Sequence, residues 1–205
     1  MSNETTPGPD EKQTDENLTG GKLTGEELYK RFLAGDSRAF EELVAIYEDD
    51  VSRFIYGNVR DFHETQHLTI DTFAQLALNK KTFKGKSTLK TYLFGIAKNL
   101  TAQHIRKRKR ELHISFEEVA ELNIDNGETI YVILEKNERK TVLKEAMREL
   151  KQDYNAVLLL LYFEDMSYKQ AGQIMNKSER QIKDLAYRAK AALKKKLENS
   201  DIFGV

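Results

Sequence analysis

Proline, the residue that most strongly interrupts helices, occurs in this chain only at positions 7 and 9. From Asp10 to Val205 every residue keeps its backbone N–H, so nothing in the covalent chain prevents long helices. Apolar residues also recur at helical spacing. Between residues 40 and 55 they stand at offsets 0, 3, 4, 7, 11, 14 and 15 from Phe40, which marks one face of a long helix. The sequence therefore predicts an all-α protein.

Interruptions of this periodicity divide the chain into two groups of helices. Short connections in the first group favour a compact four-helix bundle. Its helices are expected near residues 24–34, 37–57, 63–82 and 89–110, and those of the second group near 138–150, 156–163, 168–175 and 179–197. In the third helix the residues expected to form the buried face are Ile70, Phe73, Ala74 and Ala77. Capping boxes are expected at Thr24–Glu27 and Ser167–Gln170.

Composition marks the boundaries between these groups. Residues 1–22 are polar and acidic with almost no large apolar side chains, which is typical of a disordered tail. The expected organisation is two small helical domains joined by a flexible linker. The segments are an acidic tail at 1–22, a first domain at 23–110, an acidic linker at 111–137, a helix-turn-helix domain at 138–198 and a tail at 199–205.

Charge is balanced over the whole chain but segregated along it. Lys and Arg number 33, and Asp and Glu also number 33. Residues 98–110 nevertheless hold six bases and no acid, and residues 111–128 hold six acids and no Lys or Arg. Residues 176–196 hold eight bases against two acids. Two basic blocks separated by an acidic one predict two contacts with a polyanion and a connector between them.

Several protein classes are excluded by what the sequence lacks. It contains no cysteine, so a disulfide framework and a thiolate zinc site are excluded. Its longest apolar run, residues 156–163, is too short to cross a bilayer, so no membrane insertion is expected. The four histidines have no metal-ligand spacing, and no phosphate loop, serine elbow or catalytic carboxylate pair is evident. We therefore expect no metal, no cofactor and no enzymatic activity.

The segment Ser167–Lys196 follows the plan of a helix-turn-helix: a short helix, a tight turn and a longer basic helix. Asn176 suits the turn because asparagine adopts the left-handed backbone conformation at low cost, and Gly172 is small enough for the helices to cross closely. Arg, Gln and Lys near the start of the second helix can reach base edges in a major groove. The residues expected to face the core are Ile174, Ile182, Leu185 and Ala189. An ordinary lysine-rich surface helix is the alternative.

The first basic block lies at the distal end of a long helix. Its polar and basic residues recur near helical spacing and could follow a phosphate backbone. The loop Lys84–Thr88 before this helix is flanked by Phe83, Tyr92 and Phe94. Aromatic rings beside cations suit unstacked nucleotides, since a ring can stack on any base. The alternative is that the three aromatics are ordinary core residues.

Two stretches of the sequence resemble a known family. Region 2 of extracytoplasmic-function (ECF) sigma factors of bacterial RNA polymerase is closely similar to GDSRAF at 35–40, DTF at 71–73, FKGKSTLKTYLFGIAKNL at 83–100 and RKR at 106–108. Region 4 resembles LLLLYFEDMSY at 158–168 and IKDLAYRAKAAL at 182–193. Two motifs in the family's order are far more specific than either motif alone.

The resemblance implies an alternative sigma factor that binds core RNA polymerase and directs promoter-specific initiation. Region 2 would dock on the clamp of the largest subunit, recognise the −10 element and nucleate promoter melting. Region 4 would place its last helix in the −35 major groove and touch the flap of the second large subunit. An anti-sigma factor is a further expected partner. A cytoplasmic location, with association to the nucleoid in the holoenzyme, is implied as well.

Candidate contact residues follow from the basic segments and from the resemblance. Those expected for the −10 element are Lys84, Lys86, Ser87, Tyr92, Lys98, Asn99, Gln103, Arg106 and Arg110. Those expected for the −35 element are Ser178, Glu179, Arg180, Gln181, Lys183, Asp184, Tyr187 and Arg188. Those implied for core polymerase are Tyr47, Asp71, Phe73 and Gln75.

The sequence departs from the family's pattern at a few positions. Where the third helix of the family often carries two acids around a glutamine, residues 67–71 of this chain keep only the last acid, Asp71. The other departures are Tyr92 for a common Trp, Gln103 for a common Asp, and Asn176-Lys177 for the usual Gly-Ile of the turn.

Two other interpretations of the function stay open. One is a DNA-binding regulator that acts through its helix-turn-helix without core polymerase, and the other is a polymerase-binding protein that no longer initiates.

Overall fold

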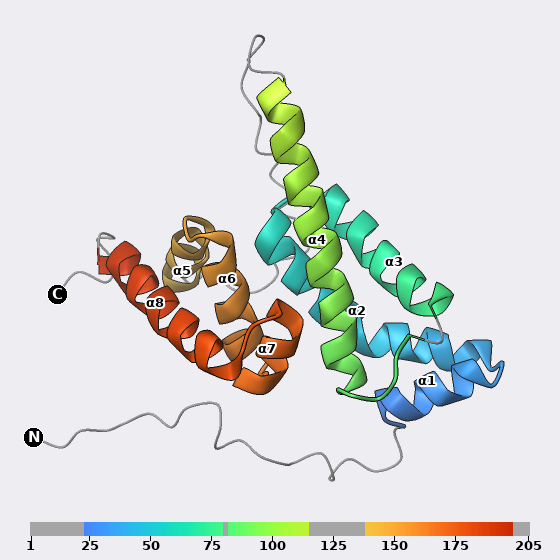
Figure 1. Cartoon of the computed structure of the whole chain (residues 1–205). Coiled ribbons are helices and arrows are strands. Elements are labelled where there is room, and N and C mark those ends of the chain that lie inside the picture. Colours follow the sequence, from blue (N-terminus) through green and yellow to red (C-terminus); the bar gives the residue numbers. More distant parts are fainter. Residues whose placement is uncertain (1–22, 80–81, 115–137, 199–205) are drawn as a thin grey trace, which may run out of the picture.

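The computed structural model describes residues 23–79, 82–114 and 138–198. Every regular element in these ranges is helical, which confirms the predicted all-α class (Figure 1). The first group contains α1 (Gly25–Leu33), α2 (Ser37–Val59), α3 (Phe62–Leu78) and α4 (Leu89–Ile114). The second contains α5 (Glu138–Arg148), α6 (Gln152–Leu158), the π-helical segment η2 (Leu159–Phe163), α7 (Tyr168–Met175) and α8 (Glu179–Glu198). The two expected tails and linker residues 115–137 lie outside the described residues.

Side-chain caps set where two of these helices begin. The backbone N–H of Glu27 donates to the Thr24 hydroxyl, and the Glu27 carboxylate accepts from the backbone N–H of Thr24 at 2.7 Å. The same reciprocal pair links Ser167 and Gln170 at the start of α7. Both predicted capping boxes are therefore confirmed. Each satisfies backbone donors that the first turn of a helix otherwise leaves without partners.

The first group of helices packs around buried aromatic and aliphatic side chains. Phe54 on α2 and Phe94 on α4 have ring centroids 5.4 Å apart, and both side chains are almost completely buried. Leu43, Leu76 and Leu93 are fully buried beside them. Burying one such leucine contributes about 1.5–3 kcal/mol. This core holds α2, α3 and α4 in a fixed relation.

The buried face of α3 differs from the one predicted. Ile70 is 66% exposed and Ala74 is also exposed, whereas Ala77 is only half-buried. The face that packs inward consists of Thr65, Leu68, Thr69, Thr72, Phe73 and Leu76. The three threonine hydroxyls donate to backbone carbonyls one turn earlier in the chain, at 2.6–2.8 Å. Because their hydroxyls are satisfied within the helix, the threonine methyl groups can enter the core beside Leu68, Phe73 and Leu76. Ile70 and Ala74 are left on the outer face.

The apolar segment predicted as one helix at 156–163 contains a change of helix type. α6 starts at Gln152 and becomes π-helical at Leu159. The backbone N–H of Glu164 then donates to the Leu159 carbonyl at 3.0 Å. The wider π turn ends with the Glu164 side chain buried, while Tyr162 and Phe163 remain substantially exposed. A continuous apolar run has no period, so it could not reveal this change.

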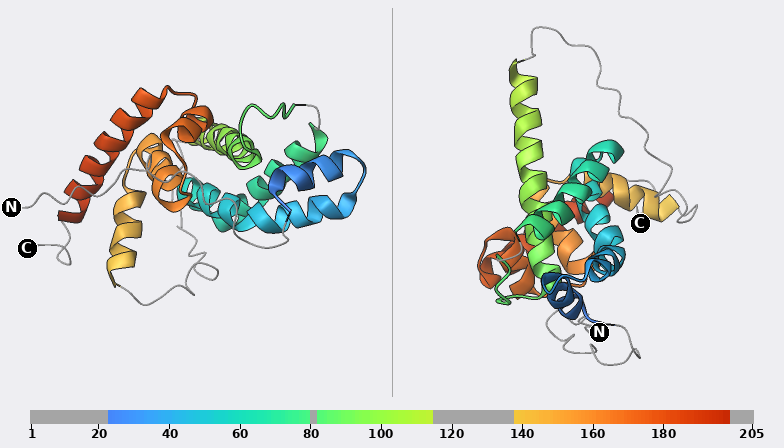
Figure 2. Two further views of the ribbon diagram at one scale, coloured as in Figure 1. Left: turned by 90° about the horizontal axis from the view of Figure 1, so that it is seen from below. Right: turned by 90° about the vertical axis from the view of Figure 1, so that its right-hand side faces the viewer.

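The two groups of helices pack against each other (Figures 1 and 2). α2 lies against α6 and η2, and α7 lies against α4. The buried apolar side chains form one continuous cluster that joins, for example, Leu93 of α4 to Met175 of α7. The sequence predicts two small helical domains joined by a linker, and the structure adds that the buried side chains of the two groups form one cluster.

Candidate nucleic-acid interface

Two hydrogen-bond acceptors fix the start of α4, and one of them lies on α1. The Thr88 hydroxyl accepts from the backbone N–H of Thr91 at 3.2 Å, as expected for a cap at this position. The Glu26 carboxylate, on α1, accepts from the backbone N–H of Leu89 at 2.7 Å. These contacts hold the loop at the start of α4 in place beside the polar face of that helix.

A polar hollow of about 620 Å³ lies along α4 and the loop before it. Six of the residues predicted to contact the −10 element line it: Lys86, Ser87, Tyr92, Asn99, Gln103 and Arg106. Gln75 of α3 and Gln173 of α7 also line the hollow. Cations and hydrogen-bonding side chains around a space of this size are suited to a polar, negatively charged ligand such as a short stretch of single-stranded nucleic acid.

The aromatic residues near this hollow have different roles. The Tyr92 ring packs 5.2 Å from the Phe83 ring, and its hydroxyl forms a hydrogen bond with Thr82. Phe83 in turn meets Tyr29 of α1 edge to face at 5.7 Å. Phe94 is fully buried against α2, so it is a core residue. Only Phe83 and Tyr92 stand at the loop, and both are partly buried.

The distal half of α4 projects beyond the helices that support its first half (Figure 1). Arg106 and Arg110 are exposed on this projecting part, and Lys98 is half-buried nearer the bundle. The Arg106 Nε donates to the Ala102 carbonyl at 3.0 Å, which keeps the guanidinium along the helix surface. Lys84, on the loop, is also exposed. These cations extend the polar surface away from the hollow.

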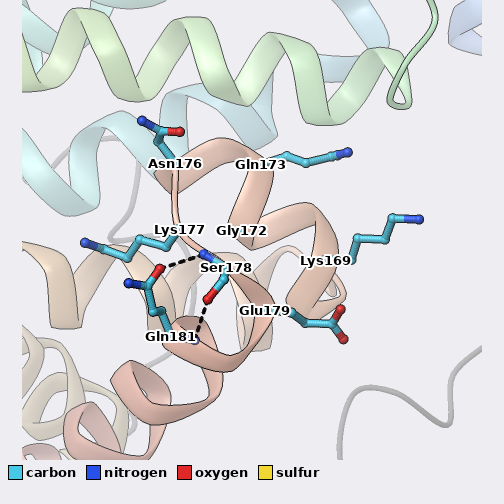
Figure 3. A pocket seen from close by; sticks show the side chains of 8 residues that line it. All are labelled: Lys169, Gly172, Gln173, Asn176, Lys177, Ser178, Glu179 and Gln181. Atoms are coloured by element: carbon cyan, nitrogen blue, oxygen red, sulfur yellow. Dashed lines mark hydrogen bonds between the residues drawn. The ribbon is translucent and has the colours of Figure 1, made fainter.

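The turn between α7 and α8 has the backbone geometry that the sequence predicted. Asn176 adopts the left-handed conformation with φ of 54°. The backbone N–H of Ser178 donates to the Gln181 side chain at 2.8 Å, and the backbone N–H of Gln181 donates to the Ser178 hydroxyl at 3.2 Å (Figure 3). Ser178 and Gln181, which are both predicted −35 contacts, thus form a reciprocal cap at the start of α8. The turn, with Lys169 and Gln173 of α7, lines an open hollow of about 470 Å³.

α8 separates a buried apolar face from an exposed polar face. Ile182, Leu185 and Ala189 are buried, as is Ile174 on α7, which confirms the predicted core face. The remaining candidate −35 residues are all exposed: Glu179, Arg180, Lys183, Asp184, Tyr187 and Arg188. Guanidinium, ammonium and phenol groups on one open helix face are suited to contact base edges and phosphates.

Replacing Asn176 with alanine is expected to lower the free energy of unfolding by about 1 kcal/mol, because a Cβ without a local hydrogen-bonding group disfavours the left-handed conformation. Replacement with glycine, which adopts that conformation freely, is expected to leave stability unchanged within a few tenths of a kcal/mol. Urea unfolding of the three proteins measures both values. Equal stability of the alanine and glycine variants would contradict the role assigned to this turn.

Comparison with known proteins identifies the family to which this chain belongs. The model of Sigma-70 region 2 matches residues 31–111, and that of Sigma-70 region 4 matches residues 140–193. The ECF RNA polymerase sigma factor SigM of Bacillus subtilis is 32% identical over 154 residues, which cover 75% of this chain and 92% of SigM. The chain belongs to the ECF sigma factor family. It is therefore an alternative sigma factor, whose regions 2 and 4 match residues 31–111 and 140–193.

Other relatives agree with this assignment. The ECF RNA polymerase sigma factor SigW of Bacillus subtilis is 26% identical over 181 residues, or 83% of this chain and 95% of SigW. The fold is shared with RpoE from Bartonella quintana, solved in complex with the anti-sigma factor NepR. That match has a TM-score of 0.64 at 22% identity and covers 78% of this chain and 98% of RpoE. CnrH, solved with the cytosolic domain of CnrY, matches with a TM-score of 0.62 at 18% identity, over 84% of this chain and 97% of CnrH.

The residues implied for core polymerase binding differ in how far their side chains are buried. Asp71 and Gln75 are exposed on α3, and Tyr47 is half-buried beside Gly25 of α1. Phe73 is only 6% exposed. Its ring packs in the core of region 2 and supports α3 from within, and a direct contact of Phe73 with polymerase stays a prediction.

The outer face of α3 carries apolar residues that sequence reasoning did not assign to a site. Ile70 is 66% exposed and Leu78 is 83% exposed, and Ala74 lies between them one helical turn from each. Asp71 stands next to this stripe. An exposed row of large apolar side chains is typical of a surface that binds another protein. The signal in the sequence was the same four-residue spacing that led to the incorrect prediction of a buried face.

Among the described residues, no helix is long and apolar enough to cross a bilayer. The same residues contain no group of three His, Cys, Asp or Glu side chains that could hold a metal ion.

Proposed function

We propose that region 2 of this sigma factor binds the non-template strand of the −10 element in the hollow along α4 while region 4 reads the −35 element with α8. The observation that carries the proposal is the presence, on one chain, of a polar hollow lined by six candidate contacts and a separate open face on α8. A hollow of this kind suits unstacked bases, and an exposed basic helix suits a major groove. Three cations of α4, Lys98, Arg106 and Arg110, would follow the phosphate backbone.

The free energies of base stacking indicate that polymerase must supply part of the energy that opens the promoter. Opening DNA loses stacking of about 1.4 kcal/mol per base step on average, whereas one captured base returns about 1–3 kcal/mol. Region 2 alone would therefore only nucleate a melted bubble. The free chain is expected to bind DNA weakly and in a salt-sensitive manner, with specific promoter binding only in the holoenzyme, and to catalyse no reaction of its own.

For core polymerase, the proposed contact is the outer face of α3 with its apolar stripe, Asp71 and Gln75, against the clamp of the largest subunit. Region 4 would touch the flap of the second large subunit. The solved relative RpoE is a sigma factor in complex with the anti-sigma factor NepR, which supports an anti-sigma factor as a further partner. This sigma factor would work in the cytoplasm, associated with the nucleoid when in the holoenzyme.

Run-off transcription with purified bacterial core polymerase on a pool of genomic fragments tests this function. Promoter-specific transcripts that depend on the added chain are the expected result. An Arg180→Ala variant is expected to reduce these transcripts about tenfold, because one lost base contact is worth about 1–3 kcal/mol. DNA binding without core polymerase would favour an independent regulator instead. Binding to core without transcripts would favour a protein that no longer initiates.

Replacing Ile70 with aspartate is expected to weaken binding to core polymerase about tenfold or more, as loss of a central apolar contact commonly does. Leu33→Asp on α1 is the matched control, because Leu33 is also an exposed apolar residue of region 2 but lies away from the α3 face. Fluorescence anisotropy of labelled protein titrated with core polymerase measures both affinities. If both variants bound core as tightly as the wild type, the α3 face would not be the docking surface.

A further inference from the structure

The loop at 82–88 carries three candidate −10 contacts, Lys84, Lys86 and Ser87, but has few contacts of its own. Lys84 and Lys86 are exposed, and neither forms a hydrogen bond or an ion pair with another described residue. The Ser87 hydroxyl donates to the carbonyl of Thr88 at 3.2 Å, which is a bond within the loop. The position of the loop therefore depends on the contacts at its two ends.

One face of α1 holds both ends of this loop. At the start of the loop, the Phe83 ring meets the Tyr29 ring edge to face at 5.7 Å. At its end, the Glu26 carboxylate accepts a hydrogen bond from the backbone N–H of Leu89 at 2.7 Å. Glu26 and Tyr29 are three residues apart, so they lie on the same face of the helix. The two contacts therefore set both ends of the loop against a single support.

α1 is itself fixed in the bundle. Leu28 and Tyr29 are each 1% exposed. Burial raises the pKa of the Tyr29 phenol above its usual value, with Tyr92 adding to the rise, so this ring stays neutral and inside the core. Gly25 packs so closely on α2 that a Cβ there would lie 2.8 Å from Cε2 of the Tyr47 ring. A helix held in this way can serve as a rigid support for the loop.

The hydrogen bond from Leu89 to Glu26 supplies what the other contacts at this end of the loop lack. The Thr88 hydroxyl accepts from the backbone N–H of Thr91, but both residues belong to the same segment of chain. The Leu89 side chain is fully buried, yet an apolar contact has no preferred direction. A carboxylate acceptor is directional and about twice as strong as a neutral one, and its charge suits the positive N-terminal end of α4.

We propose that Glu26 is a positioning residue for −10 recognition: without touching DNA, it orients the loop so that Lys86 and Ser87 face the hollow along α4. Both of these residues line that hollow. The inference rests on the proposed function in taking the hollow as the −10 site. Without the Glu26 bond the loop takes several positions. The affinity for the favoured base then falls with the fraction of time spent in the matching one.

A spin label on the loop of the free full-length protein tests whether Glu26 holds it. The chain has no cysteine, so Lys86→Cys provides a single attachment site. Glu26→Ala is expected to raise the ratio of mobile to immobile label about tenfold, as loss of a hydrogen bond to a charged group allows. Glu26→Gln keeps an acceptor oxygen in place and is expected to stay within about twofold of the wild type. Equal mobility in the alanine variant and the wild type would overturn the proposal.

Glu42→Ala is the matched control for the lost charge. Glu42 is an exposed acid on α2, and its replacement changes the net charge by the same amount as Glu26→Ala. We expect this variant to keep the wild-type label mobility. A rise as large as that of Glu26→Ala would show that net charge, and not the bond to Leu89, controls the loop, and would overturn the proposal as well.

Transcription by the holoenzyme from two promoter pools, one randomised in the −10 element and one in the −35 element, tests the role in recognition. Each pool is transcribed without the label, and the transcripts are sequenced. Glu26→Ala is expected to reduce the preference for the favoured −10 base about tenfold, roughly the contribution of one captured base, and to leave the −35 preference unchanged. Glu26→Gln is expected to keep both preferences.

A merely structural role of Glu26 gives a different result. Loss of folded protein lowers all transcripts of a pool together and leaves the preferences within the pool unchanged, because every template meets the same protein. An unchanged −10 preference in Glu26→Ala, or an equal loss of preference in both pools, would overturn the proposal. A wild-type holoenzyme without any −10 preference would contradict the proposed function instead, and the label mobility would still show whether Glu26 holds the loop.

Discussion

Replacing Gly172 with alanine is expected to lower the free energy of unfolding by about 2–3 kcal/mol, because the added methyl group has no space. A Cβ on Gly172 would lie 2.7 Å from the backbone carbonyl oxygen of Lys177. That oxygen belongs to the tight turn after Asn176, so it cannot move as a side chain would. α7 and α8 would have to separate, which displaces the start of α8, so transcription from a −35-dependent promoter should fall as well.

Gly95→Ala is the matched control for this prediction. Gly95 also lies inside a helix, yet a Cβ there meets nothing within 4 Å. Its replacement should raise the free energy of unfolding by about 0.5–1 kcal/mol, as removal of a mid-helix glycine usually does. Guanidinium unfolding followed by far-ultraviolet circular dichroism measures both variants. Should the Gly172 variant prove as stable as the Gly95 variant, the close crossing of α7 and α8 would be wrong.

The helix-turn-helix was the part of the fold best predicted from sequence, because its determinants are local. Ser167 and Gln170 cap one helix through neighbours three residues apart, and Asn176 fixes the turn by its own conformational preference. Local rules need no knowledge of the rest of the chain. The start of α1 at Thr24 was predicted for the same reason.

The buried face of α3 could not be predicted by hydrophobicity alone. Thr65, Thr69 and Thr72 are buried with their hydroxyls bonded inside the helix, while Ile70 and Leu78 face outward. A periodicity rule assigns the most apolar residues to the core. The rule fails where a protein-binding face is itself apolar, because such a face has the same helical spacing of apolar residues as a buried face. The error in the expected fold thus coincides with the proposed docking surface.

The contacts between the two regions could not be predicted from the sequence, because the contacting residues are far apart in the chain. Asn155 and Gly57 are separated by 98 residues, and neither has a neighbour whose type suggests the contact. Glu164, read in isolation, is a charged residue at the end of an apolar helix, which usually marks the return to solvent. Only the packing of α2 against η2 shows that this carboxylate is buried.

The exposure of some site residues could be predicted from the sequence, and that of others could not. Exposure of the polar face of α8 followed from helical periodicity, since the apolar residues Ile182 and Leu185 fix the opposite face. The aromatics around α4 could not be separated by spacing. Because α4 contacts α2, α3 and α7, its buried surface is wider than one stripe. Phe94 is therefore buried, while Tyr92 stays at the loop.

Replacing Phe94 with alanine is expected to lower the free energy of unfolding by about 3–5 kcal/mol, the usual cost of emptying a fully buried phenylalanine site. Phe94 is 0% exposed, and its ring centroid lies 5.4 Å from that of Phe54 in a tilted arrangement and 5.6 Å from the ammonium of Lys90. The cavity would lie between α2 and α4, the two helices that also meet Glu164. Since a domain of this size has a total stability of about 5–15 kcal/mol, region 2 should unfold well below its normal denaturant midpoint.

Phe94→Leu, which keeps most of the buried volume, should cost less than about 1.5 kcal/mol. Unfolding by guanidinium and single-stranded DNA affinity, measured on the same preparations, distinguish a core residue from a nucleotide-stacking one. A core residue loses stability in proportion to the volume removed, and the leucine variant retains DNA binding. A stacking residue would show the reverse: nearly wild-type stability in both variants, with DNA affinity lost as soon as the aromatic ring is removed. That pattern would contradict the buried position of Phe94 and would move the candidate DNA surface to the opposite side of α4.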